Sequence, residues 1–142
     1  MSRALIGSAA ALLLALAGCG GGSDDAGKRK TACAKAQSAL TKYKLAGEAV
    51  GTNFFNRAGD ERVIAAAAAM RARLQALEPL TSAQESARLQ GLARALETHE
   101  KLLGALAKHD LPVARKYATI EFERELDKGK ASFAQICKAS PS

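Results

Sequence analysis

Residues 82–108 read SAQESARLQGLARALETHEKLLGALAK, and this stretch decides the fold class. Positions three and four residues apart fall on one face of an α-helix, and here they are Leu89, Leu92, Leu96, His99, Leu103 and Leu106. Ser82 and Glu85 form a capping box, in which each side chain accepts a hydrogen bond from the backbone N–H of the other residue. The stretch therefore predicts a long amphipathic helix that ends near Lys108.

The same helical periodicity occurs twice before this stretch. The first apolar face comprises Cys33, Ala36, Leu40, Tyr43, Gly47, Val50 and Phe54. The second comprises Val63, Ala67, Met70, Leu74 and Leu77. Residues 56–59 predict a turn between these two helices, and Asp60 can cap the second one. Pro79 should end it, because proline lacks the backbone N–H that continues a helix.

A fourth helix is expected after Asp110, which can cap it, with Pro112 in the first turn, where proline is tolerated. Its apolar residues form two neighbouring stripes, Val113, Tyr117 and Ile120, then Phe122, Leu126, Phe133 and Ile136. Helices joined by short loops favour antiparallel neighbours. We therefore predict an all-α domain over residues 32–138, an antiparallel up-down-up-down four-helix bundle, followed by a tail at 139–142.

The N-terminal end of the chain has the organisation of an export signal. Arg3 precedes an apolar stretch over residues 4–16. This stretch is too short to span a bilayer, which takes about 20 apolar residues. It has the length of a signal-peptide core, and the sequence LAGC follows at residues 16–19.

LAGC resembles the lipobox of bacterial lipoproteins, in which the cysteine thiol receives a diacylglyceryl group and the chain is cleaved just before that cysteine. The resemblance implies that residues 1–18 are a signal peptide and that Cys19 carries the lipid. Two acyl chains suffice for stable attachment, so we expect an anchor on the extracytoplasmic face of the cell membrane, or in the outer membrane of a two-membrane host. An ordinary secretory signal is the alternative reading.

Residues 19–31 are rich in glycine and predict a flexible lipidated tether. A basic cluster overlaps its end, with no acid between its members: Lys28, Arg29, Lys30, Lys35, Lys42 and Lys44. Such a cluster can hold a domain against anionic lipid headgroups, at about 1 kcal/mol per residue close to the surface. A solvated, solubilising surface is the alternative. Nucleic acid is not an expected partner, because the cluster lacks interleaved aromatic side chains and the predicted location is outside the cell.

The chain contains three cysteines, and lipidation of Cys19 leaves Cys33 and Cys137 near the two ends of the predicted domain. The ends of an antiparallel four-helix bundle lie together, whereas three helices of 20 residues would separate them by about 30 Å. Because two cysteines remain in an oxidising compartment, we predict a disulfide bond between Cys33 and Cys137, and this pair in turn favours four helices over three. Two free thiols or a metal site are the alternatives. A cysteine near each end also makes the domain similar to small helical lipoproteins of high-GC bacteria, which implies no activity.

No catalytic residue, metal site or cofactor is predicted. The chain has no tryptophan, and aromatic residues make up 4% of it, so small side chains leave little room for an enclosed cofactor pocket. We predict a non-enzymatic helical interaction module for an envelope protein partner. The alternative is a small-ligand or haem-binding bundle, in which Met70 and His99 on neighbouring helices ligate iron. A histidine at the edge of the core, bonded to a polar neighbour, explains His99 without a ligand.

Overall fold

The computed structural model describes residues 21–50 and 57–138, and every regular element in those ranges is helical. The elements are α1 (Gly21–Val50), α2 (Arg57–Leu77), the 3-10 turn η1 (Glu78–Leu80), α3 (Ala83–Ala107), α4 (Leu111–Tyr117) and α5 (Ile120–Lys138). The predicted all-α class is confirmed. The described residues include no helix that is both long enough and apolar enough to cross a membrane.

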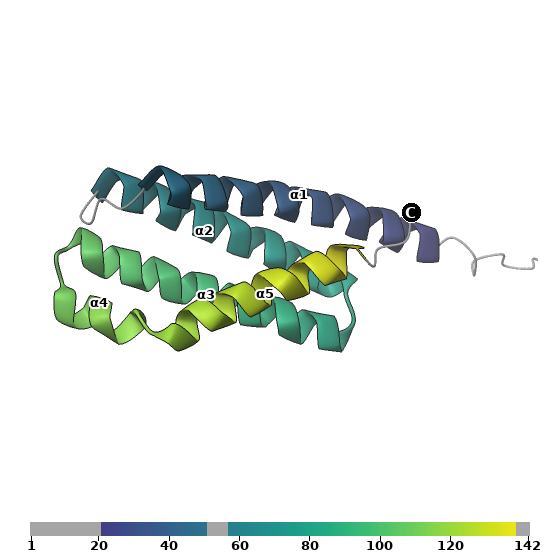
Figure 1. The fold of residues 1–142 in the computed structure, drawn as a ribbon. Helices are drawn as coiled ribbons and strands as arrows, with labels where there is room; N and C mark the ends of the chain where they lie inside the picture. The colour runs from purple at the N-terminus through teal and green to yellow at the C-terminus, as the bar shows by residue number, and fades with distance from the viewer. Residues whose placement is uncertain (1–20, 51–56, 139–142) are drawn as a thin grey trace, which may run out of the picture.

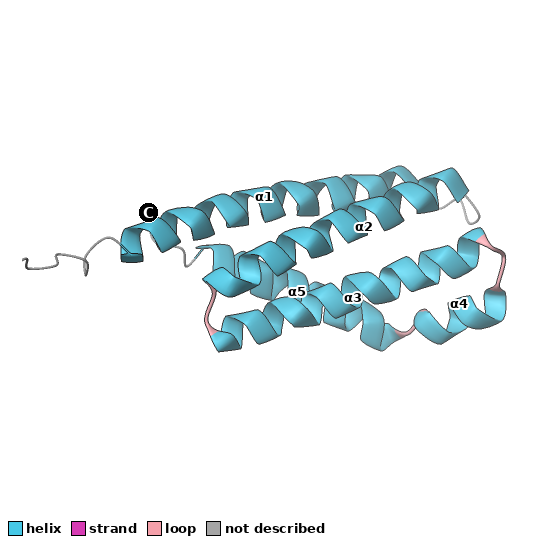
Figure 2. Cartoon of the chain, turned by 180° about the vertical axis from the view of Figure 1, so that it is seen from behind, coloured by secondary structure: helices cyan, strands magenta, loops and turns pink. Residues whose placement is uncertain are grey.

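From α1 to α4, helices that are consecutive in the chain lie side by side, and α5 follows α4 along α3 (Figure 1). α1 packs along α2, α2 packs along α3, and α3 contacts both α4 and α5. The view from behind shows the same order, with α4 beside the C-terminal half of α3 (Figure 2). The end of α5 returns to the N-terminal part of α1, where Cys33 and Cys137 are bonded.

The core is built from the predicted apolar faces. The largest side chains with almost no exposed surface are Phe133, Met70, Leu74, Leu77, Leu89, Leu92, Leu96 and Val63. Burying a side chain of this size contributes about 1.5–3 kcal/mol relative to leaving it in water. Leucines spaced along α2 and α3 therefore hold these two helices together, and Phe133 joins α5 to them.

Helix α3 begins as the sequence predicts. Ser82 Oγ accepts a hydrogen bond from the Glu85 N–H at 3.2 Å, and a carboxylate oxygen of Glu85 accepts one from the Ser82 N–H at 2.9 Å. At the other end, His109 adopts a left-handed conformation with φ of 58°, which closes the turn into α4. Asp110 caps α4 as predicted, because its carboxylate accepts from the Val113 N–H.

The predicted flexible tether is wrong for residues 21–31, which belong to α1. Cys19 and Gly20 lie outside the described residues. Asp24 lies in the first turn of α1, where a negative charge interacts favourably with the helix dipole. The side chain of Arg29 bonds to Glu85 of α3 and to the Ile136 carbonyl of α5. These long-range contacts order a segment whose glycine content alone favours a coil.

The predicted turn at residues 56–59 is also wrong in the part that the structure describes, because α2 begins at Arg57. Residue 56 lies outside the described ranges. Arg57 pairs with Glu61 one turn later, at 3.0 Å, and this spacing stabilises the first turn. Asp60 is therefore not the N-terminal cap but a buried residue inside α2.

The predicted fourth helix is divided into α4 and α5. The break falls at Ala118, which leaves helical geometry with ψ of 71°, and the Thr119 hydroxyl then accepts a hydrogen bond from the Phe122 N–H. The two apolar stripes of this segment do not line up on one continuous helix. The break lets α5 turn its own stripe toward α3, and it leaves Val113 and Ile120 exposed.

Candidate functional site

The predicted disulfide bond is confirmed. Cys33 of α1 and Cys137 of α5 are bonded, with their Cα atoms 5.5 Å apart and 104 residues between them in sequence. The bond joins the first and last described helices at one end of the bundle. Cys33 is buried in the core, and Cys137 packs against it from the surface.

Arg29 and Glu85 form a polar cluster close to this bond. The guanidinium donates to both carboxylate oxygens of Glu85, at 2.7 and 3.1 Å, and to the Ile136 carbonyl at 2.9 Å. These bonds from Arg29, followed by the one from the Ser82 N–H, hold the pKa of Glu85 below its ordinary value. Sequence reasoning missed this role, because Arg29 and Glu85 are 56 residues apart and share no local motif.

The predicted basic cluster does not form a single surface. Residues seven apart lie on one side of a helix, so Lys28, Lys35 and Lys42 share one stripe of α1. Lys30 and Lys44 fall on the opposite stripe, and Arg29 points toward α3 and α5. The spacing of seven residues was the signal in the sequence that could have separated these groups.

His99 belongs to an aromatic cluster at the edge of the core. Its Nδ1 atom lies 2.5 Å from the Tyr43 hydroxyl, and its ring centroid lies 5.4 Å from that of Phe122. Burial raises the pKa of Tyr43 to about 12, while burial and then the charge of Lys130 lower the pKa of His99. A protonated phenol beside a neutral imidazole lets Tyr43 donate to Nδ1, which leaves the ring proton on Nε2.

The structure gives the haem alternative no support. Met70 has no exposed surface and lies within the core of α2 and its neighbours. His99 already has a polar partner in Tyr43. Within residues 21–50 and 57–138, no group of three or more His, Cys, Asp and Glu side chains could hold a metal ion.

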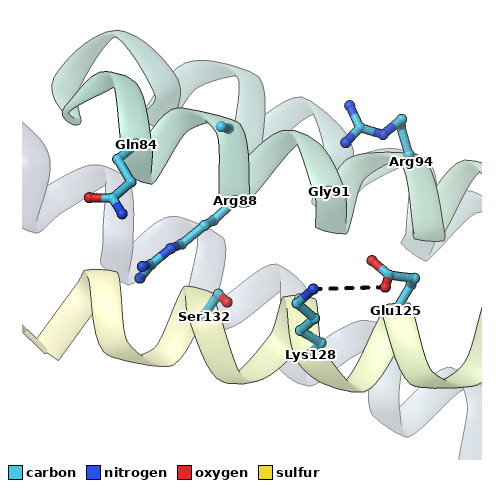
Figure 3. A pocket seen from close by; sticks show the side chains of 9 residues that line it. Gln84, Arg88, Gly91, Arg94, Glu125, Lys128 and Ser132 are labelled. Carbon is cyan, nitrogen blue, oxygen red and sulfur yellow. Dashed lines mark ion pairs between the residues drawn. The ribbon is translucent and has the colours of Figure 1, made fainter.

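A groove of about 300 Å³, lined mainly by residues with polar or charged side chains, lies between α3 and α5 (Figure 3). Its lining includes Gln84, Arg88, Gly91 and Arg94 of α3, and Glu125, Lys128, Gly129 and Ser132 of α5. The side chain of Arg88 reaches across toward Ser132, while Lys128 pairs with Glu125 at 3.9 Å along α5 (Figure 3). The lining contains no histidine or cysteine, so it offers charged and hydrogen-bonding groups without a paired nucleophile and base.

The floor of this groove is set by two glycines that differ in their surroundings. A Cβ atom added to Gly129 would lie 2.9 Å from Leu92 Cβ, so this glycine permits the close approach of α3 and α5. A Cβ atom added to Gly91 would meet nothing within 4 Å.

Comparison with known proteins adds no relative, since no family model, curated protein or solved structure matches the chain.

Proposed function

We propose that the protein is a membrane-anchored envelope lipoprotein whose helical domain is a non-enzymatic interaction module. The Cys33–Cys137 disulfide carries the proposal, because such bonds persist in oxidising compartments outside the cytoplasm. The LAGC sequence at residues 16–19 supplies the anchor, with the lipid on Cys19 and the signal peptide at residues 1–18. These residues lie outside the described part of the structure.

We also propose that the domain is an antiparallel up-down-up-down four-helix bundle, in which α4 and α5 together form an interrupted fourth helix. The side-by-side order of α1, α2 and α3 supports this arrangement, as does the contact of α3 with both α4 and α5. The disulfide between α1 and α5 also supports it, because this topology brings the start of the first helix and the end of the last one together. An anchor at Cys19 would place this disulfide end nearest the membrane.

The opposite end of the bundle is the proposed surface for an envelope protein partner. The large apolar side chains exposed in the described residues are Leu45, Leu111, Val113 and Ile120. They lie near the end of α1, on α4 and at the start of α5, in the half of the bundle away from the disulfide. Exposed apolar side chains gathered toward one end support a protein contact there.

Metabolic labelling with radioactive palmitate tests the anchor. Replacing Cys19 with alanine should abolish the label and release the protein from the membrane fraction, because the lipid has no other attachment point in the lipobox. The matched control is Cys33→Ser, which removes a different cysteine and should leave the label in place. A Cys19→Ala protein that still labels and still sediments with membranes would contradict the lipoprotein proposal.

Photo-crosslinking in intact envelopes tests the interaction surface. A photoreactive residue at Val113 or Ile120 should yield a defined crosslinked species, whereas the same residue at exposed Ala131, closer to the disulfide, should not. Equal yields from all three positions would show that the protein has no preferred contact at this end.

A further inference from the structure

A second groove lies between α1 and α2, and its walls carry only positive charge. Lys35 and Lys42 extend from α1, and Arg73 extends from α2. The remaining lining residues are small: Ser38, Ala39, Ala66 and Ala69. The groove has a volume of about 260 Å³, and no acidic side chain lines it. Both views show α1 and α2 side by side along their length (Figures 1 and 2).

Two other helix contacts pair a cation with an acid, whereas this α1–α2 groove does not. Across α2 and α3, Arg71 bonds to Glu100 at 3.0 Å, and across α1 and α3, Arg29 bonds to Glu85 at 2.7 Å. The groove between α1 and α5 also lacks an acid, but its charged lining residues are two lysines, Lys30 and Lys138, without an arginine. Among the described residues, the charged groups of Lys35, Lys42 and Arg73 have neither an ion pair nor a hydrogen bond. Like charges that face one another across a groove repel, and an anion between them would remove that repulsion.

The local sequence explains why the groove stays open. Residues 65–69 are all alanine, with Ala67 buried in the core and Ala66 and Ala69 at the groove. Their single methyl groups leave space between the helices that longer side chains would fill. On α1, Lys35 and Lys42 are seven residues apart, so both lie along the same edge of the groove.

We propose that the α1–α2 groove binds a phosphate-bearing anion. The planar guanidinium of Arg73 can donate two parallel hydrogen bonds to phosphate oxygens, while Lys35 and Lys42 act as point charges. The Ser38 hydroxyl adds a neutral donor at the same site. A phosphate group, whose oxygens can accept from several donors at once, matches this set of cations better than a single carboxylate. The phosphate could belong to a lipid headgroup or to free inorganic phosphate, and the proposal does not depend on the lipid anchor at Cys19.

Isothermal titration of the full chain, purified in a non-ionic detergent at low salt, tests the proposal. The probes are inorganic phosphate and, separately, micelles doped with phosphatidylglycerol or with phosphatidylcholine. The groove variant is Lys35→Gln with Lys42→Gln, and a second variant is Arg73→Gln. The matched control is Lys30→Gln with Lys44→Gln, which removes the same charge from the opposite stripe of α1. Helical circular dichroism and melting curves establish that all variants are folded.

The groove variant should bind about 25-fold more weakly, because each cation near a phosphate contributes about fivefold, and Arg73→Gln alone should lose about fivefold. The control should change by less than about threefold, because Lys30 and Lys44 lie on the opposite stripe of α1 and do not line the α1–α2 groove. Saturable binding of inorganic phosphate with this pattern would identify a free phosphate ligand. The same pattern only with phosphatidylglycerol would identify a lipid headgroup. Equal losses in the groove variant and the control, or no response to either probe, would overturn the proposal.

Discussion

The contact between α3 and α5 can be tested with two glycine-to-alanine substitutions. Gly129→Ala would place a methyl group 2.9 Å from Leu92 Cβ and 3.0 Å from Leu92 Cα. The second of these atoms is backbone, so a side-chain rotation cannot relieve the contact and the two helices must move apart. Gly91→Ala is the matched control, because it adds the same methyl group to a helix where nothing lies within 4 Å.

Both substitutions gain the helix propensity of alanine over glycine, about 1 kcal/mol each. Overpacking adds a cost of about 1–3 kcal/mol to Gly129→Ala only. The difference in the free energy of unfolding between the variants isolates this cost, since the propensity gain is common to both. Gly91→Ala should therefore be more stable than the parent chain, and Gly129→Ala should be less stable than Gly91→Ala by about 1–3 kcal/mol.

Thermal unfolding followed by circular dichroism, with the disulfide intact, measures this difference. A change of 1 kcal/mol shifts the melting temperature of a domain of roughly 100 residues by about 4 °C or more. The two variants should therefore melt at clearly different temperatures. Equal melting temperatures would refute the reasoning, because α3 and α5 could then not be as close at Gly129 as the structure shows.

Three further results are expected. Reducing the Cys33–Cys137 bond should lower the melting temperature but keep the helical signal, because the bond acts largely on the unfolded chain, by up to about 4.7 kcal/mol for a loop of this size; an unchanged melting curve would contradict this. Arg29→Met should cost about 1 kcal/mol in urea unfolding, because the partly buried Glu85 carboxylate and Ile136 carbonyl lose the hydrogen bonds that Arg29 donates. It should also make stability fall less steeply as the pH drops below the ordinary pKa of Glu85, 4.5, because Arg29 no longer lowers that pKa. Because the pKa of His99 is lowered in the folded protein, its neutral ring contributes its full stabilisation above pH 6.5, and this stabilisation is lost as the pH falls below that value. The melting temperature of His99→Gln should therefore change less between pH 7 and pH 5 than that of the parent chain.

Local patterns were sufficient to predict much of the fold. The leucine spacing and the capping box of α3 are read within a few turns of helix, and both appear in the structure. The disulfide followed from the number of cysteines, since Cys33 and Cys137 remain once Cys19 is assigned to the lipid. The first two features depend on residues close in sequence, and the disulfide depends on how many cysteines the chain has.

The errors arose where distant residues override local preference. Glycines near the start of α1 favour a coil, but Arg29 forms hydrogen bonds to α3 and α5 that hold this segment in place. No local sequence pattern predicts these bonds. The break between α4 and α5 falls at Ala118 and Thr119, and neither residue is a glycine or proline that would predict it. The break follows instead from the packing of the apolar stripe of α5 against α3. The α1–α2 groove could not be predicted either, because Lys35 and Arg73 come together only once the two helices are paired.

The early start of α1 alters how an anchored domain would move. A lipid on Cys19 would leave only Gly20 before the first residue of α1, and that helix has 30 residues, a length of about 45 Å. The domain would then reorient together with α1, instead of moving independently of the bilayer on a flexible linker. The height at which its far end meets a partner would be set by the tilt of a single helix.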